Sequence, residues 1–230
     1  MSLSAILTEA FHFFRNHIRQ LAMLTIPLLL LQVGIQLWIG SELSKVDMEN
    51  PQFGNSIFVA MIVLLLVFSL LIAALTLFLE VRSQGHNPST FELLKASMPF
   101  VPPLLLAAVF SGLAILGPVM ISATMGPAVV IGFVISFYVF ARLTYVNFMV
   151  VSERLTPLEA IKGSFRMSGP IVMKTIGIIS LYIPLSLIGG SLSAAATQLG
   201  FPLQLAVETL VAFLGLFVNI ALFRLYMLNR

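Results

Sequence analysis

The sequence of 230 residues contains no cysteine, one aspartate and three histidines, and only 9% of its residues are charged. Without cysteine the chain can form no disulfide, no thiolate metal site and no cysteine nucleophile. A soluble domain carries about 25% charged and about 45–50% apolar residues, whereas 59% of this chain is apolar. A domain of this size cannot bury so much apolar surface, so much of its surroundings is expected to be lipid. The composition excludes the soluble globular, disordered, collagen-like and disulfide-scaffold classes.

Six apolar runs are each long enough to cross a bilayer as a helix, which takes about 20 residues for about 30 Å of hydrocarbon. The runs are continuous, whereas the strands of a membrane barrel alternate between polar and apolar residues. No clear A-x-A cleavage site follows the first run, so it is interpreted as a retained span and not as a signal peptide. The predicted spans are Leu21–Ile39, Ile57–Leu79, Phe100–Ser122, Ala128–Val151, Ile171–Gly190 and Leu203–Phe223.

The basic residues predict how these spans are oriented. Ten of the twelve lysines and arginines flank the spans on one side, while the loops on the other side hold only Lys45. The first loop on that other side is net acidic, with Glu42, Asp47 and Glu49. Cytoplasmic loops carry the excess of lysine and arginine in membrane proteins. We therefore expect both termini and the two long charged loops to lie in the cytoplasm.

The same basic residues bear on the partners of the protein. Anionic lipids of an inner leaflet attract basic side chains beside the spans by about 1 kcal/mol each. No basic surface interleaved with aromatic residues is large enough for DNA or RNA, so nucleic acid is not expected as a partner. The residues expected at the membrane surface are Arg15, Arg19, Lys95, Lys162, Arg166 and Lys174.

Two of the cytoplasmic loops contain matching amphipathic segments. Residues 91–98 (FELLKASM) and 158–165 (LEAIKGSF) have glutamate, lysine and serine at the same positions. Each segment begins with a capping-box pattern, Ser89 to Glu92 in one and Thr156 to Glu159 in the other. A looser third copy, with an apolar stripe at helical spacing, precedes the first span.

Each amphipathic segment precedes two spans, which predicts one all-α integral membrane domain over residues 1–230. It would be a bundle of six transmembrane helices with cytoplasmic interfacial helices. Three helix–span–span repeats, at about 1–86, 87–153 and 154–230, would pack with pseudo-threefold symmetry. The alternative stays open, because any loop helix beside a membrane tends to be amphipathic and basic.

Arg142 lies inside a predicted span, about 13 Å from its end by helix rise and so near mid-bilayer. An unpaired charge there costs at least about 2.5–3.5 kcal/mol on insertion scales. It is either a substrate or headgroup contact in a polar cavity, or a brace to Glu80 or to carbonyls freed by a nearby proline. Glu208 lies too far away for direct contact with Arg142. Asn147 and Asn219 are amides of the kind that often bond between membrane helices.

Groups that carry chemistry are nearly absent from the sequence. The single aspartate leaves no aspartyl pair, and there is no H-E-x-x-H, G-x-S-x-G or P-loop motif. A serine nucleophile would need a nearby base, and the spans contain no histidine. His12, His17 and His86 lack zinc-ligand spacing. We therefore expect no catalytic, cofactor-binding or metal-binding residues.

Three parts of the sequence together suggest a family: Met1–Ala5 with Phe13–Asn16, the loop from Val151 to Met167, and the closing Leu222–Leu228 (LFRLYML). In these segments the chain resembles the YciC family of Gram-negative inner-membrane proteins. The chain is also distantly similar to the membrane domain attached to some glycerophosphodiesterases. The resemblance implies a multi-pass protein of the bacterial inner membrane without an established catalytic activity, and it implies no particular site residues.

Together these observations predict a non-enzymatic inner-membrane protein that serves as a scaffold or accessory partner in envelope or lipid homeostasis. Its partners would be the anionic inner leaflet and another membrane or periplasmic protein. The alternative is a small transporter or lipid-handling protein with a polar cavity near Arg142. That alternative predicts an opening between the repeats that lipid or water can reach.

Overall fold

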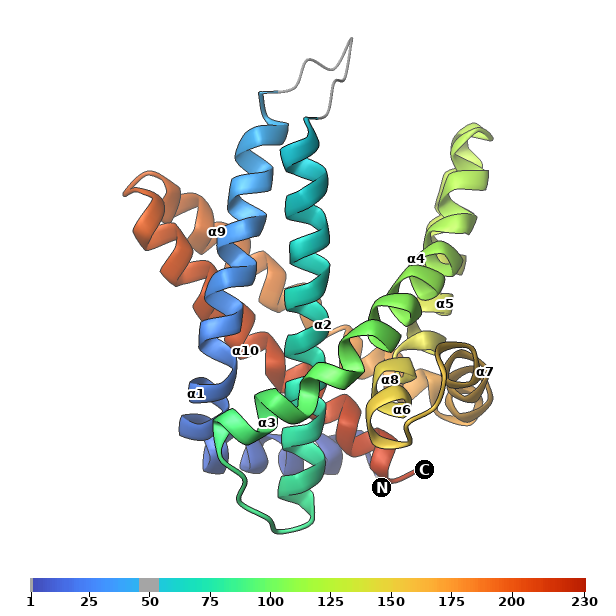
Figure 1. The fold of residues 1–230 in the computed structure, drawn as a ribbon. Helices are drawn as coiled ribbons and strands as arrows, with labels where there is room; N and C mark the ends of the chain where they lie inside the picture. Colours follow the sequence, from blue (N-terminus) through green and yellow to red (C-terminus); the bar gives the residue numbers. More distant parts are fainter. Residues whose placement is uncertain (1, 46–53) are drawn as a thin grey trace.

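The computed structural model describes residues 2–45 and 54–230, and every regular element in them is a helix (Figure 1). This confirms the prediction of an all-α fold. Met1, and Asp47 and Glu49 of the predicted acidic loop, lie outside the described residues. The helices are α1 (Leu3–Leu43), α2 (Asn55–Ser83), α3 (Thr90–Ser97), α4 (Val101–Ala123), α5 (Val129–Leu143), α6 (Val146–Ser152), α7 (Pro157–Ser168), α8 (Val172–Ile179), α9 (Tyr182–Thr197) and α10 (Phe201–Met227), with 3-10 turns at Met98–Phe100, Gly126–Ala128 and Gly169–Ile171.

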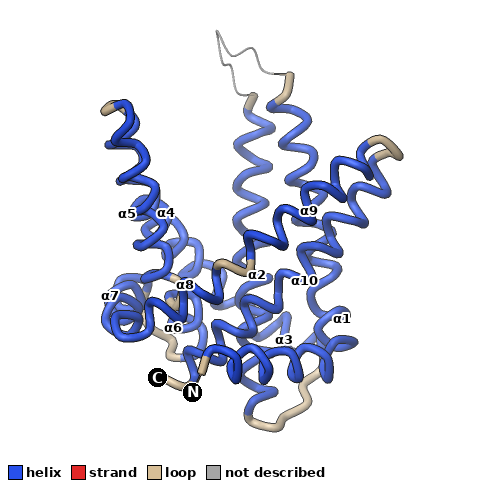
Figure 2. Tube along the Cα trace, turned by 180° about the vertical axis from the view of Figure 1, so that it is seen from behind, coloured by secondary structure: helices blue, strands red, loops and turns tan. Residues whose placement is uncertain are grey.

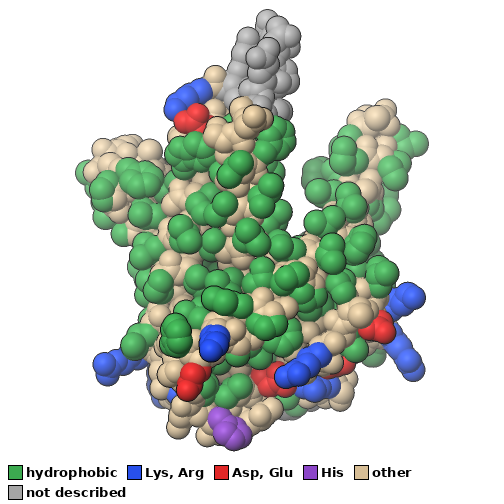
Figure 3. Space-filling model, viewed as in Figure 1, with side chains coloured by type: hydrophobic (Ala, Val, Ile, Leu, Met, Phe, Trp, Pro, Cys, Tyr) green, Lys and Arg blue, Asp and Glu red, His purple; other side chains and the backbone are tan. Residues whose placement is uncertain are grey.

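Six helical stretches of the structure are long and apolar enough to cross a membrane, and each matches one predicted span to within a residue or contains it. Many large apolar side chains are exposed along these stretches, and hydrophobic side chains are spread over the helices on the face shown in Figure 3. Exposed apolar area of this extent is unfavourable in water and is expected where lipid is the solvent. The chain therefore has the architecture of a multi-pass membrane protein.

Three antiparallel helix pairs rise from a common end of the molecule, namely α1 with α2, α4 with α5, and α9 with α10 (Figures 1 and 2). We call this end the base. Both termini lie at the base, and so do the α2–α3 and α6–α7 connections (Figure 1). The first part of α1 lies across the base before the helix turns upward, so one helix supplies both the amphipathic segment and the first span.

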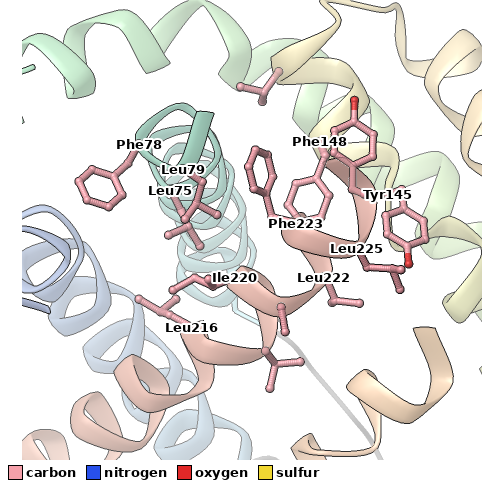
Figure 4. Close-up of a cluster of buried hydrophobic side chains, with 14 of the residues drawn as sticks. Leu75, Phe78, Leu79, Tyr145, Phe148, Leu216, Ile220, Leu222, Phe223 and Leu225 are labelled. Atoms are coloured by element: carbon pink, nitrogen blue, oxygen red, sulfur yellow. The ribbon is translucent and has the colours of Figure 1, made fainter. Parts of the chain in front are cut away.

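The three hairpins meet in one apolar core near the base (Figure 4). The rings of Tyr145, Phe148, Phe223 and Tyr226 pack with centroids 5.4 to 6.4 Å apart. Such pairs contribute about 0.5–1.5 kcal/mol each beyond the area that they bury. The Tyr145 hydroxyl is hydrogen-bonded to Thr175 Oγ1 at 2.5 Å, which satisfies a polar group inside the core. Residues of α2, α6 and α10 thus hold the hairpins together below the level at which they diverge.

The C-terminal residues tie the hairpins together at the surface of the base. Arg224 Nη2 lies 2.6 Å from Glu9 Oε2 of α1. Arg230 lies 3.7 Å from Glu80 of α2 and 4.0 Å from Glu153, which follows α6. Since these side chains are partly exposed, each pair is expected to contribute at most about 1 kcal/mol.

Glycine allows close contact within two of the hairpins. A Cβ on Gly132 of α5 would lie 2.7 Å from the Pro118 carbonyl oxygen of α4. A Cβ on Gly189 of α9 would lie 2.6 Å from Cγ1 of Val211 in α10. Small residues at such contacts let membrane helices approach and pack through their backbones. These two glycines therefore set the spacing of α4–α5 and α9–α10.

Two of the predicted spans are interrupted in the structure. Span four consists of α5 and α6, which are separated at Thr144 and Tyr145. Span five consists of α8 and α9, which are separated at Ser180 and Leu181, with Pro184 in the first turn of α9. Proline is tolerated in a first turn because the amide hydrogen that it lacks would be unpaired there. Hydropathy predicted continuous spans because it does not register the break between two apolar helices.

Helices α3 and α7 begin with the predicted capping boxes. The Ser89 amide donates to Glu92 Oε2 at 2.9 Å, and the Thr156 amide donates to Glu159 Oε2 at 3.0 Å. The bonds from the Ser89 amide and hydroxyl hold the pKa of Glu92 below its usual range, and those from the Thr156 hydroxyl and amide do the same for Glu159. Both carboxylates lie in a first turn, where negative charge is stabilised by the helix dipole.

The matching segments also share a burial pattern. Ser97 of α3 and Ser164 of α7 are fully buried. Phe91 and Leu158, at the first position of the two segments, are 76% and 57% exposed. The first stripe residue of each segment therefore points away from the protein, as expected for a helix in the surface of a membrane, whereas Leu94, Ile161 and Phe165 are partly buried and pack against the core.

The apolar stripe at the start of α1 is buried more deeply than those of α3 and α7. Its apolar residues Ile6, Ala10 and Phe14 are buried, and Phe14 packs against Phe213 of α10 with ring centroids 5.5 Å apart. These residues of the stripe thus belong to the protein core, while Phe11 and Ile18 of the same stripe are exposed. The three-repeat organisation and the pseudo-threefold packing stay predictions.

The placement of both termini and both charged loops at the base makes the predicted orientation testable. Because the natural chain has no cysteine, single cysteines can be labelled without background. We expect Ser44→Cys, at the far end of α1, to react with a membrane-impermeant maleimide in sealed right-side-out vesicles. Gln84→Cys, at the base, is expected to react only after the membrane is opened. The reverse pattern would contradict a cytoplasmic base.

Candidate functional site

A cavity of about 410 Å³ lies where the three hairpins diverge. We call it the central cavity. Its walls come from α2, α4, α5, α6, α8, α9 and α10, and they are mostly apolar. The lining residues are Phe68, Ser69, Ile72, Leu104, Ala108, Ser111, Gly112, Ile115, Phe140, Leu143, Thr144, Val146, Asn147, Ile179, Tyr182, Asn219 and Leu222.

A second hollow of about 420 Å³ adjoins the central cavity between α1, α2, α9 and α10. We call it the side groove. The two share Phe68, Ile72, Tyr182 and Asn219 in their walls. Both volumes are within the roughly 300–1,000 Å³ of small-molecule sites in proteins. The arrangement therefore offers two adjoining, largely apolar compartments with polar groups at their boundary.

The central cavity reaches the outer surface of the protein. Phe68 of α2 and Phe140 of α5, which both line it, are 38% and 39% exposed. The space-filling view shows a deep notch between the α1–α2 and α4–α5 hairpins, with hydrophobic side chains on both sides (Figure 3). Helices α2, α4 and α5 belong to the cavity wall and border the notch. A molecule dissolved in the bilayer could enter sideways through such an opening.

Two uncharged polar side chains meet at the boundary of the two compartments. Asn219 Nδ2 of α10 donates a hydrogen bond to the Tyr182 hydroxyl of α9 at 2.9 Å. Asn147 of α6 also lines the central cavity, and its amide has no hydrogen-bond partner in the part of the chain that the structure describes. Buried or half-buried polar groups usually have partners, so an unpaired amide beside a cavity is available to a ligand.

Two further polar atoms at the compartments are unpaired. Ser111 Oγ in the wall of the central cavity and Gln32 Oε1 in the wall of the side groove are buried without a hydrogen-bond partner. A buried polar atom without a partner costs about 1–3 kcal/mol. A ligand that supplied those hydrogen bonds would recover part of that cost.

Arg142, in the last turn of α5, is held by α7. Its Nε donates to Ser168 Oγ at 2.9 Å, its Nη1 donates to the Tyr138 hydroxyl at 2.6 Å, and its Nη2 donates to the Phe165 carbonyl oxygen. The guanidinium also lies 5.2 Å from the centre of the Phe165 ring. Phe165 belongs to the last turn of α7, where carbonyls lack helical partners and the dipole is negative. Arg142 therefore caps the C-terminal end of α7.

This geometry is that of a brace, and of the two predicted kinds of partner Arg142 contacts a backbone carbonyl and not Glu80. Within the described residues Arg142 makes no contact with Glu80, whose carboxylate is paired with Arg230. The brace is made to the last turn of α7, which ends two residues before Pro170. The mid-bilayer position applies to an unbroken span, whereas α5 ends at Leu143 and the Arg142 side chain lies beside the interfacial helix α7. Arg142 does not line the central cavity.

The other predicted polar residues are dispersed over the molecule. Glu208 accepts hydrogen bonds from Ser193 Oγ at 2.5 Å and from Gln204 Nε2 at 3.0 Å, within the α9–α10 hairpin. Of Arg142, Glu80, Glu208 and Asn147, only Asn147 lines the central cavity. The predicted surface residues Arg15, Arg19, Lys95, Lys162, Arg166 and Lys174 are all exposed.

The sequence alone does not predict that Tyr182 and Asn219 line a cavity. It indicates Asn219 as an ordinary interhelical amide and does not single out Tyr182. The signal that could have found them is the presence of a tyrosine and an asparagine within long apolar runs. Their meeting, however, depends on the packing of α9 against α10, 37 positions apart in the sequence.

Comparison with known proteins does not add a relative to this site. No protein-family model, no curated protein and no solved structure matches the chain. The resemblance to the YciC family therefore stays a prediction, and the function is argued from the geometry. No group of three or more metal-ligating side chains occurs within residues 2–45 and 54–230.

Proposed function

We propose that this protein handles lipid, taking one lipid-like molecule at a time from the bilayer into the central cavity. The observation that carries the proposal is a cavity with apolar walls, polar groups at its inner boundary and an opening toward the lipid-facing surface. Apolar walls with a few convergent polar groups are characteristic of ligand sites. We place the protein in a bacterial inner membrane, with the base in the cytoplasm.

The proposal is one of binding and not of chemistry. The described lining residues include no histidine, carboxylate, lysine or arginine that could act as a general base or acid. The residues supply instead a surface for an acyl or isoprenoid chain and hydrogen bonds for a small head. Arg142, bound to α7, supports the cavity wall from outside by fixing the end of α5.

Filling the central cavity should weaken lipid binding without unfolding the protein. Gly112 lines the cavity, and a Cβ placed on it would meet no atom within 4 Å. We expect Gly112→Leu to lower cross-linking to a photoactivatable lipid in native membranes by about tenfold, a loss near 1.4 kcal/mol. Gly117→Leu is the matched control, because Gly117 is on the same helix, has the same free space and lies outside both compartments.

The comparison of the two variants decides the proposal. Equal cross-linking in Gly112→Leu, Gly117→Leu and the wild type would contradict binding in the central cavity. Thermal unfolding in detergent should be similar for both variants, because each leucine enters open space and improves the helix propensity of α4.

An accessory-scaffold function is the second candidate, and the outer half of the α4–α5 hairpin favours it. This part stands apart from the other hairpins (Figure 1), and its side chains Leu113, Met120 and Phe133 are exposed. A photo-cross-linking residue at position 113 would give a discrete protein adduct if a membrane partner packs there. The same residue at Phe58 of α2 is the control. Adducts with lipid alone at both positions would count against a partner on this hairpin.

A further inference from the structure

The polar groups that face the two compartments are all uncharged. Serine, threonine, asparagine, glutamine and tyrosine are present, and the described lining residues include no charged side chain. The charged residues of the protein gather mainly at the base (Figure 3). The nearest charged neighbour by sequence, Arg142, is already bound to α7. An ionised group inside the compartments would therefore find no counter-charge.

Electrostatics then selects among lipids. Moving an ionised group from water into an apolar site without a partner of opposite charge is strongly unfavourable. A neutral hydroxyl or carbonyl needs only hydrogen bonds, and uncharged donors and acceptors can supply them. Phospholipids, whose head is ionised, would have to leave the head outside the cavity.

The unused hydrogen-bonding capacity fits a small neutral head. The Tyr182 oxygen accepts from Asn219 Nδ2, which leaves the Tyr182 hydroxyl hydrogen free to donate. Asn219 Oδ1 has no partner among the described residues, and the Asn147 amide offers a donor and an acceptor. Ser111 Oγ adds a hydroxyl that can act as either. One hydroxyl group on a ligand could both accept and donate in this setting.

We propose that the ligand is a neutral long-chain lipid with a single hydroxyl head, such as a long-chain alcohol. The head would bind between Asn147, Tyr182 and Asn219, and the chain would lie along the apolar walls of the central cavity and the side groove. This inference rests on the proposed lipid-handling function and specifies the class of its ligand. A hydroxyl head is favoured over a purely accepting head because Asn219 Oδ1 needs a donor.

The test compares a photoactivatable long-chain alcohol with the sulfate ester of the same alcohol. The sulfate keeps its charge at any working pH, so it cannot escape the penalty by protonation. Purified wild-type protein in nanodiscs is expected to cross-link to the alcohol at least about tenfold more than to the sulfate. Equal cross-linking of both probes, lowered equally by Gly112→Leu, would overturn the neutral-head inference and leave lipid binding intact. If neither probe's cross-linking responds to Gly112→Leu, the proposed function itself fails.

Substitutions at the head site make the test residue-specific. Tyr182→Phe removes one hydroxyl and keeps the ring, and it should weaken alcohol cross-linking about fivefold, as for one lost hydrogen bond. Asn147→Leu should also weaken alcohol cross-linking, because it removes the amide from the head site. Asn147 has no hydrogen-bond partner among the described residues, so the substitution breaks no structural hydrogen bond. Cross-linking of the sulfate should not change in either variant. Unchanged cross-linking of the alcohol in both variants would overturn the assignment of the head site.

A matched pair of serines controls for loss of a buried hydroxyl in general. Ser111 Oγ and Ser136 Oγ are both buried in the α4–α5 hairpin without a partner, but only Ser111 lines the central cavity. Ser111→Ala is expected to reduce cross-linking of the alcohol, and Ser136→Ala is expected to leave it at the wild-type level. The same reduction in both variants would point to a change in the hairpin and contradict a direct role of Ser111.

Discussion

Replacing Gly132 with alanine is expected to lower the free energy of unfolding by about 2 kcal/mol, and replacing it with leucine should prevent α4 and α5 from closing. A Cβ at this position would overlap the Ser122 side chain and lie 2.7 Å from the Pro118 carbonyl oxygen. The serine side chain can rotate, but the backbone oxygen can move only if the two helices separate. Overpacking therefore outweighs the higher helix propensity of alanine, which is worth about 1 kcal/mol.

Unfolding in detergent with increasing fractions of sodium dodecyl sulfate would measure this loss. Gly117→Ala is the control, because a Cβ at Gly117 meets no atom within 4 Å and alanine should be neutral or stabilising there. The double variant Ser122→Gly with Gly132→Ala should recover only part of the loss, since the Pro118 oxygen remains. A Gly132→Ala protein as stable as Gly117→Ala would show that the α4–α5 contact is looser than described.

Replacing Arg142 with methionine is the second change with a large expected effect. We expect it to lower the free energy of unfolding by about 2–4 kcal/mol. The substitution keeps an unbranched chain but removes the donors to Phe165, Ser168 and Tyr138. Hydrogen bonds to charged groups contribute about 1.5–3 kcal/mol, and the last-turn carbonyl of α7 would be left unpaired. The loss of unfolding free energy for Arg142→Lys should be intermediate. Lysine keeps the positive charge near the helix end but lacks the planar guanidinium group with its several donors.

A double-mutant cycle separates this brace from the contact with Glu80 that the sequence suggested. Arg142 and Glu80 do not touch in the described structure, so the effects of Arg142→Met and Glu80→Gln should add within about 0.5 kcal/mol. Arg142→Met and Tyr138→Phe, in contrast, should show coupling because the two side chains are hydrogen-bonded. Coupling of 1 kcal/mol or more between Arg142 and Glu80 would contradict the assignment.

Local patterns predicted the elements that depend on neighbouring residues. The six apolar runs correspond to the six candidate spans. A helix that can cross a membrane is recognised by the length and the apolar composition of one continuous segment, and both can be read from the sequence. The capping boxes at Ser89 and Thr156 formed as predicted, since each joins residues three positions apart. The matching serines Ser97 and Ser164 share full burial, which the sequence match alone could not assign to a face of the helix.

The environment of Arg142 could be predicted only in part. Its cost inside an apolar run indicated that it must have partners, and a carbonyl near a proline was one of the alternatives. Whether Arg142 contacts that carbonyl or Glu80 depends on where α7 packs against α5. The hydropathy of the sequence does not predict this packing. The break after Leu143 likewise changed the surroundings of the arginine from a continuous span to the end of a helix.

The sequence by itself determined that six stretches are long and apolar enough to cross a membrane, where the basic residues gather along the chain and how α3 and α7 begin. Composition and short-range spacing suffice for these features because solvent transfer and capping are local effects. Only the tertiary structure decided that Arg142 caps α7, that Glu80 pairs with Arg230, and that Asn147, Tyr182 and Asn219 border one cavity. These contacts join distant parts of the chain, and they depend on the angles at which the three hairpins diverge.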